Sequence, residues 1–228
     1  MEILYKDDNI PSVYRLKCKL SLERSFIMKS KLFSLMLVLV LTFAFVSAMP
    51  SGAFAAKKEL VIADFDTGDK PNNIGGDFGG WDKDPNDETQ GTQMSFEPDD
   101  ALGDPAGYSI RLDYDVDSPN PAYNGMWMKL NGEDATPYNT LNFYIKGDKT
   151  AGFTKRVKLE LKDMSNKPSP YIVTGITDQW KKVSIPFEKF RRIADWKSLN
   201  EFIIVFDDIN SSPKTGTIYI DQVTLSQE

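Results

Sequence analysis

The sequence predicts an all-β fold, a β-sandwich of the jelly-roll type built from about ten short antiparallel strands. Three observations favour this fold class. Strand-length segments alternate apolar and polar residues, turn-forming Gly, Pro, Asn and Asp residues separate these segments, and helical periodicity is almost absent. The pattern is typical of a protein whose core lies between two sheets.

The expected strands follow one another along the chain, with a turn or loop between each pair. They cover Leu60–Phe65, Thr92–Phe96, Tyr108–Val116, Tyr123–Leu130, Thr140–Lys146, Arg156–Asp163, Tyr171–Thr174, Lys181–Pro186, Glu201–Phe206 and Thr217–Leu225. The connecting segments include PNN, SPNP, KGD and NSSPKTG, which have the composition of turns. The single helix-like piece, Phe187–Leu199, is mixed in character and predicts one or two helical turns at most.

Alternation within the strands assigns their side chains to two faces. In Tyr108–Val116 every second residue is apolar, with Arg111 and Asp113 between the apolar positions. Thr140–Lys146 and Arg156–Asp163 alternate in the same way. We therefore expect one apolar face and one face that carries Arg, Asp, Glu, Lys, Tyr and Trp side chains together.

The N-terminal region has the organisation of a signal peptide over residues 28–55. Lys29 and Lys31 form a positive region, Leu32–Phe45 is apolar, and the segment ends in the small-residue motif Ala-Phe-Ala at Ala55. The sequence predicts export with cleavage near Ala55, so that the mature protein is secreted, extracellular or periplasmic. An uncleaved N-terminal anchor is the alternative, although the apolar run is short for a bilayer core.

The domain boundaries follow from this signal. Residues 1–27 are an unusually long leader, and we hypothesise that the start codon is misassigned and that Met28 is the true initiator. Residues 56–228 then form one domain, long enough to bury a core of its own. The only cysteine, Cys18, lies in the leader, so core packing and not disulfides must stabilise this domain.

The composition excludes several functions. The chain has no histidine, which excludes Ser-His-Asp and Cys-His catalysis, imidazole-ligated zinc and histidine acid–base chemistry. Its formal net charge of −6 argues against nucleic acid or an anionic membrane surface as a partner. We expect a monomer whose mature domain does not insert into a membrane.

The predicted polar face suits a carbohydrate. A sugar ring packs its C–H face on an aromatic side chain, and its hydroxyls need charged or polar hydrogen-bonding groups. The candidate binding residues, if their strands lie side by side, are Arg111, Asp113, Trp127, Tyr144, Glu160 and Tyr171. The alternative is an ordinary solvated face, because Tyr and Lys also occur on strands for their β-propensity alone.

The abundant carboxylates raise the alternative of a glycosidase. Such an enzyme needs two carboxylates about 5–9.5 Å apart. Most acidic residues here lie in Gly-, Pro- and Asn-rich loops, where solvated surface is the default. We therefore interpret the domain as non-catalytic.

Acidic residues also raise the question of calcium, which prefers carboxylate, amide and backbone oxygens. The segment Asp82–Asn86 resembles the opening of an EF-hand loop, but Asp87 stands where Gly is required and Gln93 where the bidentate Glu is required. Asp66, after the first strand, and Asp221, in the last strand, share one ion if these strands are neighbours. A simple turn around Asp66 is the alternative.

The C-terminal half resembles a known superfamily. WKKVSIPFEKF from Trp180, DWKSLNEFIIVF from Asp195 and GTIYIDQV from Gly216 are similar to the galactose-binding-like jelly rolls. Within these, the pattern resembles family 11 carbohydrate-binding modules and the related complex I intermediate-associated proteins. The opening IADFD at Ile62, followed by Gly75-Gly76 and Trp81, agrees with this resemblance.

The resemblance implies a β-sandwich with a concave glycan-binding face and a structural calcium ion that joins the N- and C-terminal strands. Asp66 and Asp221 match the positions of its early and late acidic ligands. The polar face of Tyr108–Val116, Thr140–Lys146 and Arg156–Asp163 would be the concave one. The expected partner is a polysaccharide or cell-surface glycan; because the complex I relatives bind protein, a structural, adhesion or protein-assembly role is the alternative.

Overall fold

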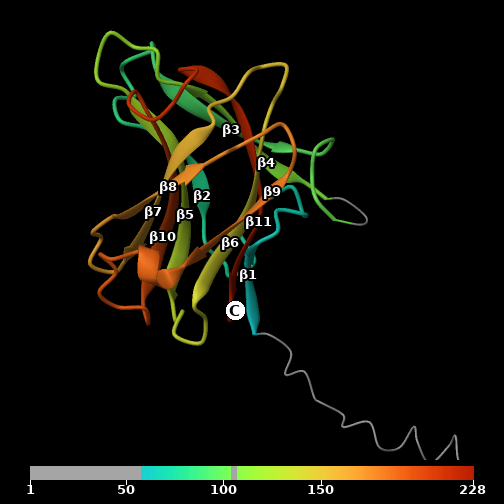
Figure 1. The fold of residues 1–228 in the computed structure, drawn as a ribbon, viewed down its shortest axis with the longest axis vertical. Coiled ribbons are helices and arrows are strands. Elements are labelled where there is room, and N and C mark those ends of the chain that lie inside the picture. The colour runs from blue at the N-terminus through green and yellow to red at the C-terminus, as the bar shows by residue number, and fades with distance from the viewer. Residues whose placement is uncertain (1–57, 104–106) are drawn as a thin grey trace, which may run out of the picture. The chain divides into compact units, whose positions relative to one another are not determined.

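Eleven strands form two antiparallel sheets that pack face to face in the computed structural model, which describes residues 58–103 and 107–228 (Figure 1). The strands are β1 (Glu59–Ala63), β2 (Phe78–Asp82), β3 (Gly91–Glu97), β4 (Ser109–Asp115), β5 (Tyr123–Glu133), β6 (Thr140–Gly147), β7 (Arg156–Asp163), β8 (Ser169–Thr174), β9 (Lys181–Pro186), β10 (Leu199–Asp207) and β11 (Thr215–Ser226). The all-β jelly-roll sandwich predicted from the sequence is confirmed.

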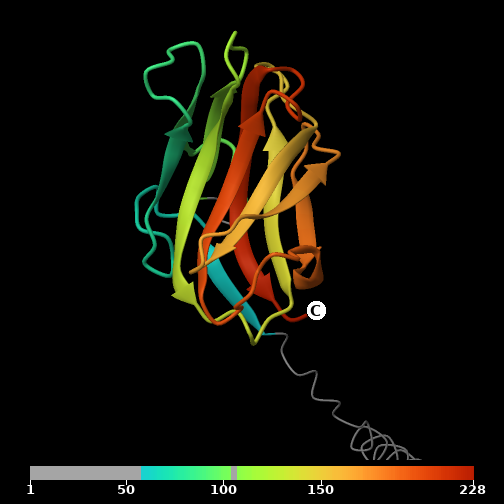
Figure 2. The ribbon, with the colours of Figure 1, turned by 90° about the vertical axis from the view of Figure 1, so that its left-hand side faces the viewer.

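The two sheets differ in how their strands are ordered. The six-stranded sheet runs β3-β4-β11-β6-β9, with β1 pairing to the second half of β11. The five-stranded sheet runs β2-β5-β10-β7-β8, and Figure 2 looks onto its outer face. The pairing of β1 with β11 confirms that the first and last strands are neighbours.

One strand escapes sequence prediction. β2 reads FGGWD, and the two glycines remove the β-branched and alternating signal by which strands are recognised. The helix-like piece 187–199 agrees with the expected one or two helical turns, because Phe187–Lys189 forms a short 3₁₀ helix and turns lead from there to β10. Among the described residues, no helix is long and apolar enough to cross a membrane.

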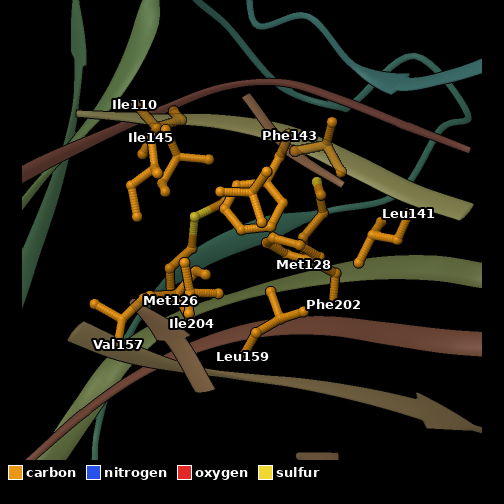
Figure 3. Close-up of a cluster of buried hydrophobic side chains, with 14 of the residues drawn as sticks. Ile110, Met126, Met128, Leu141, Phe143, Ile145, Val157, Leu159, Phe202 and Ile204 are labelled. Atoms are coloured by element: carbon orange, nitrogen blue, oxygen red, sulfur yellow. The ribbon is translucent and has the colours of Figure 1, made fainter. Parts of the chain in front are cut away.

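The hydrophobic core fills the space between the sheets (Figure 3). Phe143 of β6 meets Phe202 of β10 edge to face, with ring centroids 5.7 Å apart. The fully buried residues around this pair come from both sheets and include Ile110, Met126, Met128, Leu141, Ile145, Val157, Leu159 and Ile204. Their alternation in the sequence is therefore the alternation between core and outer face.

The sandwich corrects one expectation about the polar positions. β4 and β6 belong to the six-stranded sheet, whereas β7 belongs to the five-stranded sheet. Because each sheet turns its apolar side to the shared core, the polar sides of the two sheets point in opposite directions. The single polar face expected from the alternation is in fact two outer faces. The predicted leader and signal peptide, residues 1–55, lie outside the described residues.

Candidate functional site

The outer face of the five-stranded sheet carries a row of large side chains across its middle. Ile203 of β10 is paired with Trp127 of β5 on one side and with Glu160 of β7 on the other. Trp127 is paired in turn with Gly79 of β2, and its indole lies 3.5 Å from the position that a β-carbon on Gly79 would occupy. Because Gly79 has no side chain, the Trp127 indole can lie close against the backbone of β2.

A second row lies beside the first, one side-chain step further along the strands. Trp81 of β2 pairs with Gly125 of β5, and Val205 of β10 pairs with the same glycine. A β-carbon on Gly125 would overlap the carbonyl oxygen of Ile204. The Trp81 ring meets Tyr123 edge to face, with centroids 5.8 Å apart. Together the two rows make an apolar strip that crosses the strands.

These side chains line a groove of about 360 Å³ on the outer face. Its lining residues are Trp81, Tyr123, Trp127, Glu160, Lys162, Asn166, Pro168, Glu201 and Ile203. They reach from β2 across β5 and β10 to β7 and the loop that follows it. Three aromatic rings and several charged or amide groups therefore face the same open space, which is the combination that a sugar chain requires. We call this space the aromatic groove.

Charged side chains border the aromatic groove on the side toward the start of β10. Glu201 lies between Lys129 on β5 and Lys162 on β7, and it is ion-paired to both. Burial alone would raise the pKa of Glu201. The hydrogen bonds from the two lysines outweigh this effect and hold the pKa of Glu201 below its usual range. Glu201 is therefore a carboxylate that accepts hydrogen bonds, with ammonium donors on either side.

A second set of charges borders the opposite side. The Lys158 Nζ lies 3.6 Å from the Glu160 carboxylate and 3.4 Å from that of Asp207. Within the residues that the structure describes, the apolar strip is thus flanked by ion-paired donors and acceptors on both sides. A ring that stacks on the strip places its edges, where hydroxyls project, beside these groups.

The outer face of the six-stranded sheet holds Arg111 and Asp113, and its groups bond to one another. The Arg111 guanidinium donates to both carboxylate oxygens of Asp113 at 2.9–3.1 Å, and it donates to the Tyr219 hydroxyl at 3.2 Å. The Tyr219 hydroxyl donates to Asp148 at 2.7 Å. This network leaves Arg111 and Asp113 largely committed to structural partners.

A loop also crosses the six-stranded sheet on this outer face. Asp100, in the connection between β3 and β4, is ion-paired to Lys146 of β6, and the Leu102 N–H donates to Asp221 of β11 at 2.8 Å. Tyr144 lies on the same face and is half-buried, paired with Asp221. This face is therefore partly covered, in contrast to the aromatic groove on the opposite side of the sandwich.

The six predicted binding residues are thus divided among three places. Trp127 and Glu160 lie together in the aromatic groove, whereas Arg111, Asp113 and Tyr144 lie on the six-stranded sheet. Tyr171 corrects another expectation, because it pairs with Leu159, an inward-facing residue. Its ring packs on the buried Phe190, with centroids 6.2 Å apart, and belongs to the edge of the core.

The chain matches one protein-family model over most of its length. Residues 72–227 match the model described as "Carbohydrate binding domain 30". The chain belongs to this carbohydrate-binding family. The search of curated proteins found no match.

Solved structures with the same fold as this family 30 domain include other carbohydrate-binding modules. A family 11 module from a cellulosomal cellulase of Clostridium thermocellum has a TM-score of 0.54 at 18% identity, covering 76% of this chain and 97% of that one. The same organism's family 11 module in complex with a β-1,3-1,4-mixed-linked tetrasaccharide has a TM-score of 0.53 at 17% identity, with the same coverage. An exo-β-agarase matches with a TM-score of 0.54 at 11% identity, over 74% of this chain and 25% of that chain.

Sequence reasoning missed several groove residues of this family 30 domain. Trp81 and its neighbour Gly79 lie in the unpredicted strand β2, and Tyr123 stands at the first position of β5. Each Trp is paired with a Gly on the adjacent strand, and this pairing is a signal for such residues. The signal can be used only when the strand order is known. Glu201 was missed because it is the first residue of the predicted strand Glu201–Phe206. At that position the alternation predicts only that the side chain faces solvent.

The predicted metal residues are brought to one end of the β1–β11 pair. Asp221 is fully buried, and its carboxylate accepts the N–H groups of Leu102 and Gln222 at 2.8 and 2.7 Å. Burial, together with repulsion by Asp66 and Asp64, raises the pKa of Asp221 to about 6. Burial and the neighbouring Asp64 likewise raise the pKa of Asp66.

This cluster has the charge that a cation would balance, but it is an incomplete metal site by side chains alone. In residues 58–103 and 107–228, no Lys or Arg forms an ion pair with Asp221. Over the same residues, no three acidic, histidine or cysteine side chains form a group that could hold a metal. A calcium ion here would need Asp66 and Asp221 together with backbone or amide oxygens, which it accepts readily.

Proposed function

We propose that this family 30 domain binds a polysaccharide in the aromatic groove and that it does so without catalysis. The observation that carries the proposal is the geometry of the groove. Trp81, Tyr123 and Trp127 face one open space, and the ion-paired rows around Glu201 and Glu160 border it. Flat aromatic surfaces flanked by fixed donors and acceptors match the two faces and the hydroxyl-bearing edges of a sugar ring.

A β-linked glycan is the first ligand to test. The apolar strip crosses several strands, each about 4.8 Å from the next, so a linear chain of a few sugar units would span it. The structurally similar family 11 module is known in complex with a β-1,3-1,4-mixed-linked tetrasaccharide, which makes that glucan the natural probe. The ion-paired groups of the groove compensate one another, which favours a neutral glycan.

Affinity electrophoresis in gels that contain mixed-linkage β-1,3-1,4-glucan, xylan, agarose or no polysaccharide tests this proposal. We expect retardation in the presence of at least the mixed-linkage glucan, and loss of that retardation in the Trp127→Ala variant. Release of no reducing sugar during prolonged incubation would support the absence of catalysis. Unretarded migration in every gel would contradict the proposal.

We also propose that Asp66 and Asp221 hold a structural calcium ion. The support is the buried Asp221 carboxylate, which feels the negative charges of Asp66 and Asp64, in a region where β1, β11 and the Leu102 segment meet. An ion that binds only the native state stabilises it by mass action. Chelation should therefore lower the melting temperature, added calcium should restore it, and Asp221→Asn should abolish the response. An unchanged melting temperature after chelation would contradict it.

Secretion and a monomeric state complete the proposal. Export is supported by residues 28–55, which carry the sequence pattern of a signal peptide. N-terminal sequencing of the exported protein tests cleavage near Ala55, and a mature chain that begins before Met28 would contradict the proposed initiator. Sedimentation of residues 56–228 tests the monomer.

A further inference from the structure

We propose that Asp87 is a positioning residue for the aromatic groove, acting through Gln90 on Tyr123. Asp87 lies in the loop between β2 and β3, outside the groove lining. The inference rests on the proposed function of the groove, because it assigns Asp87 the task of holding one of the three aromatic rings in place.

Asp87 joins two loops that are far apart in the sequence. Its carboxylate accepts hydrogen bonds from the N–H of Thr89 at 3.1 Å and from its hydroxyl at 2.6 Å. Across the gap to the loop between β4 and β5, it accepts the Ser118 hydroxyl at 3.0 Å and the Asn120 amide at 3.1 Å. These contacts fix the second loop immediately before Tyr123.

Gln90 carries the connection to Tyr123. Its side-chain amide donates from Nε2 to Asp87 Oδ2 at 2.9 Å, and its Oε1 accepts the backbone N–H of Tyr123 at 3.2 Å. An ionised carboxylate can only accept hydrogen bonds, so Asp87 requires the NH₂ end of this amide to face it. The amide oxygen is thereby left pointing at the Tyr123 N–H, and Gln90 is buried in this orientation.

The carboxylate of Asp87 is well suited to this task. The hydrogen bonds from Thr89, Gln90 and Asn120 hold its pKa well below its usual range. It therefore remains an ionised acceptor for the amide of Gln90 at acidic pH values where an ordinary Asp would begin to take up a proton.

Tyr123 needs such support because it stands at the end of a strand. Its side chain is 41% exposed and touches the groove from the first position of β5. Its ring meets Trp81 at 5.8 Å and the ammonium of Lys83 at 5.0 Å. The Tyr123 carbonyl accepts the Lys83 N–H at 3.2 Å, and Gln90, held by Asp87, fixes the other backbone group of Tyr123, its N–H.

Two measurements on the Asp87→Ala variant of the full chain test the inference. Hydrogen exchange of the Tyr123 amide should accelerate about tenfold or more, since its acceptor is no longer held in place. Affinity for soluble mixed-linkage β-1,3-1,4-glucan, measured by calorimetry, should fall about three- to tenfold. Asp84→Ala is the matched control, because among the described residues the Asp84 carboxylate bonds only to Asn86 within its own loop, and it should change neither quantity.

A double-mutant cycle separates positioning from a general loss of structure. In the Tyr123→Ala background, Asp87→Ala should cause no further loss of affinity, because its effect passes through Tyr123. A full additional loss in that background, or unchanged exchange at Tyr123, would overturn the inference. If the unmodified protein does not bind the glucan while the exchange at Tyr123 still responds, the proposed ligand fails and the coupling of Asp87 to Tyr123 stands.

Discussion

Trp127 and Ile203 lie directly opposite each other on β5 and β10, at the centre of the outer face of the five-stranded sheet. Ile203 is nearly buried there although it points away from the core. An apolar residue covered on an outer face, next to a half-buried Trp, makes the floor of a groove and not an ordinary solvated surface.

Replacing Trp127 with Ala should weaken glycan binding by about tenfold or more, because a central aromatic residue that stacks on the ligand dominates such a contact. The matched control is Trp180→Ala, since Trp180 packs beside Tyr219 on the six-stranded sheet. Calorimetric titration with mixed-linkage glucan should give unchanged affinity for the control. Equal losses for the two variants would show that the groove is not the binding face.

Arg111→Ala should leave glycan affinity unchanged and lower stability by about 1 kcal/mol. Arg111 lies on the sheet opposite the groove and is paired with Asp113 and Tyr219, so its removal leaves carboxylates without a counter-charge. Urea unfolding and calorimetry on the same preparation measure both quantities. A variant that folds normally and no longer binds would place the ligand on the six-stranded sheet.

Gly125→Ala should be strongly destabilising, by about 3 kcal/mol or more. The added methyl group would overlap the carbonyl oxygen of Ile204 on the adjacent strand, where neither backbone can give way. Gly79→Ala is the comparison, because a β-carbon there meets the Trp127 indole at 3.5 Å, an ordinary contact. Thermal unfolding should show a much larger shift for the first variant than for the second.

Asp163 should make the free energy of unfolding depend on pH in the acidic range. It is buried, and hydrogen bonds from the Ser165 hydroxyl and from the Ala194 N–H lower the pKa of Asp163 to about 2. An unfolded Asp titrates near 3.9, so the carboxylate stabilises the fold above about pH 4, and this contribution is lost as the pH falls through the folded value.

Unfolding of the Asp163→Asn variant tests this dependence. Between pH 5 and pH 2, the variant should lose about 2 kcal/mol less stability than the unmodified protein, because it has no carboxylate to protonate. The exposed Asp99, changed to Asn, is the control and should follow the unmodified protein. If the free energy of unfolding fell equally with pH in all three proteins, Asp163 would not be the source of the pH dependence.

The sequence by itself determined the fold class, ten of the eleven strands and the inward or outward direction of most strand residues. These features are local, because alternation and turn chemistry act over a few neighbouring residues. β2 escaped because Gly79 and Gly80 carry no strand signal, although they make room for Trp127 and for the neighbouring backbone. The pairing of the first strand with the last also agrees with the sequence-based expectation.

Only the tertiary structure decided which polar residues share a surface. Arg111 and Glu160 have the same alternation in the sequence, yet they face opposite sides of the sandwich because β4 and β7 belong to different sheets. Sheet membership depends on pairing between strands distant in the chain, which a local pattern does not encode. The aromatic groove exists because β2, β5, β10 and β7 are neighbours, and that order brings Trp81, Trp127 and Glu160 together.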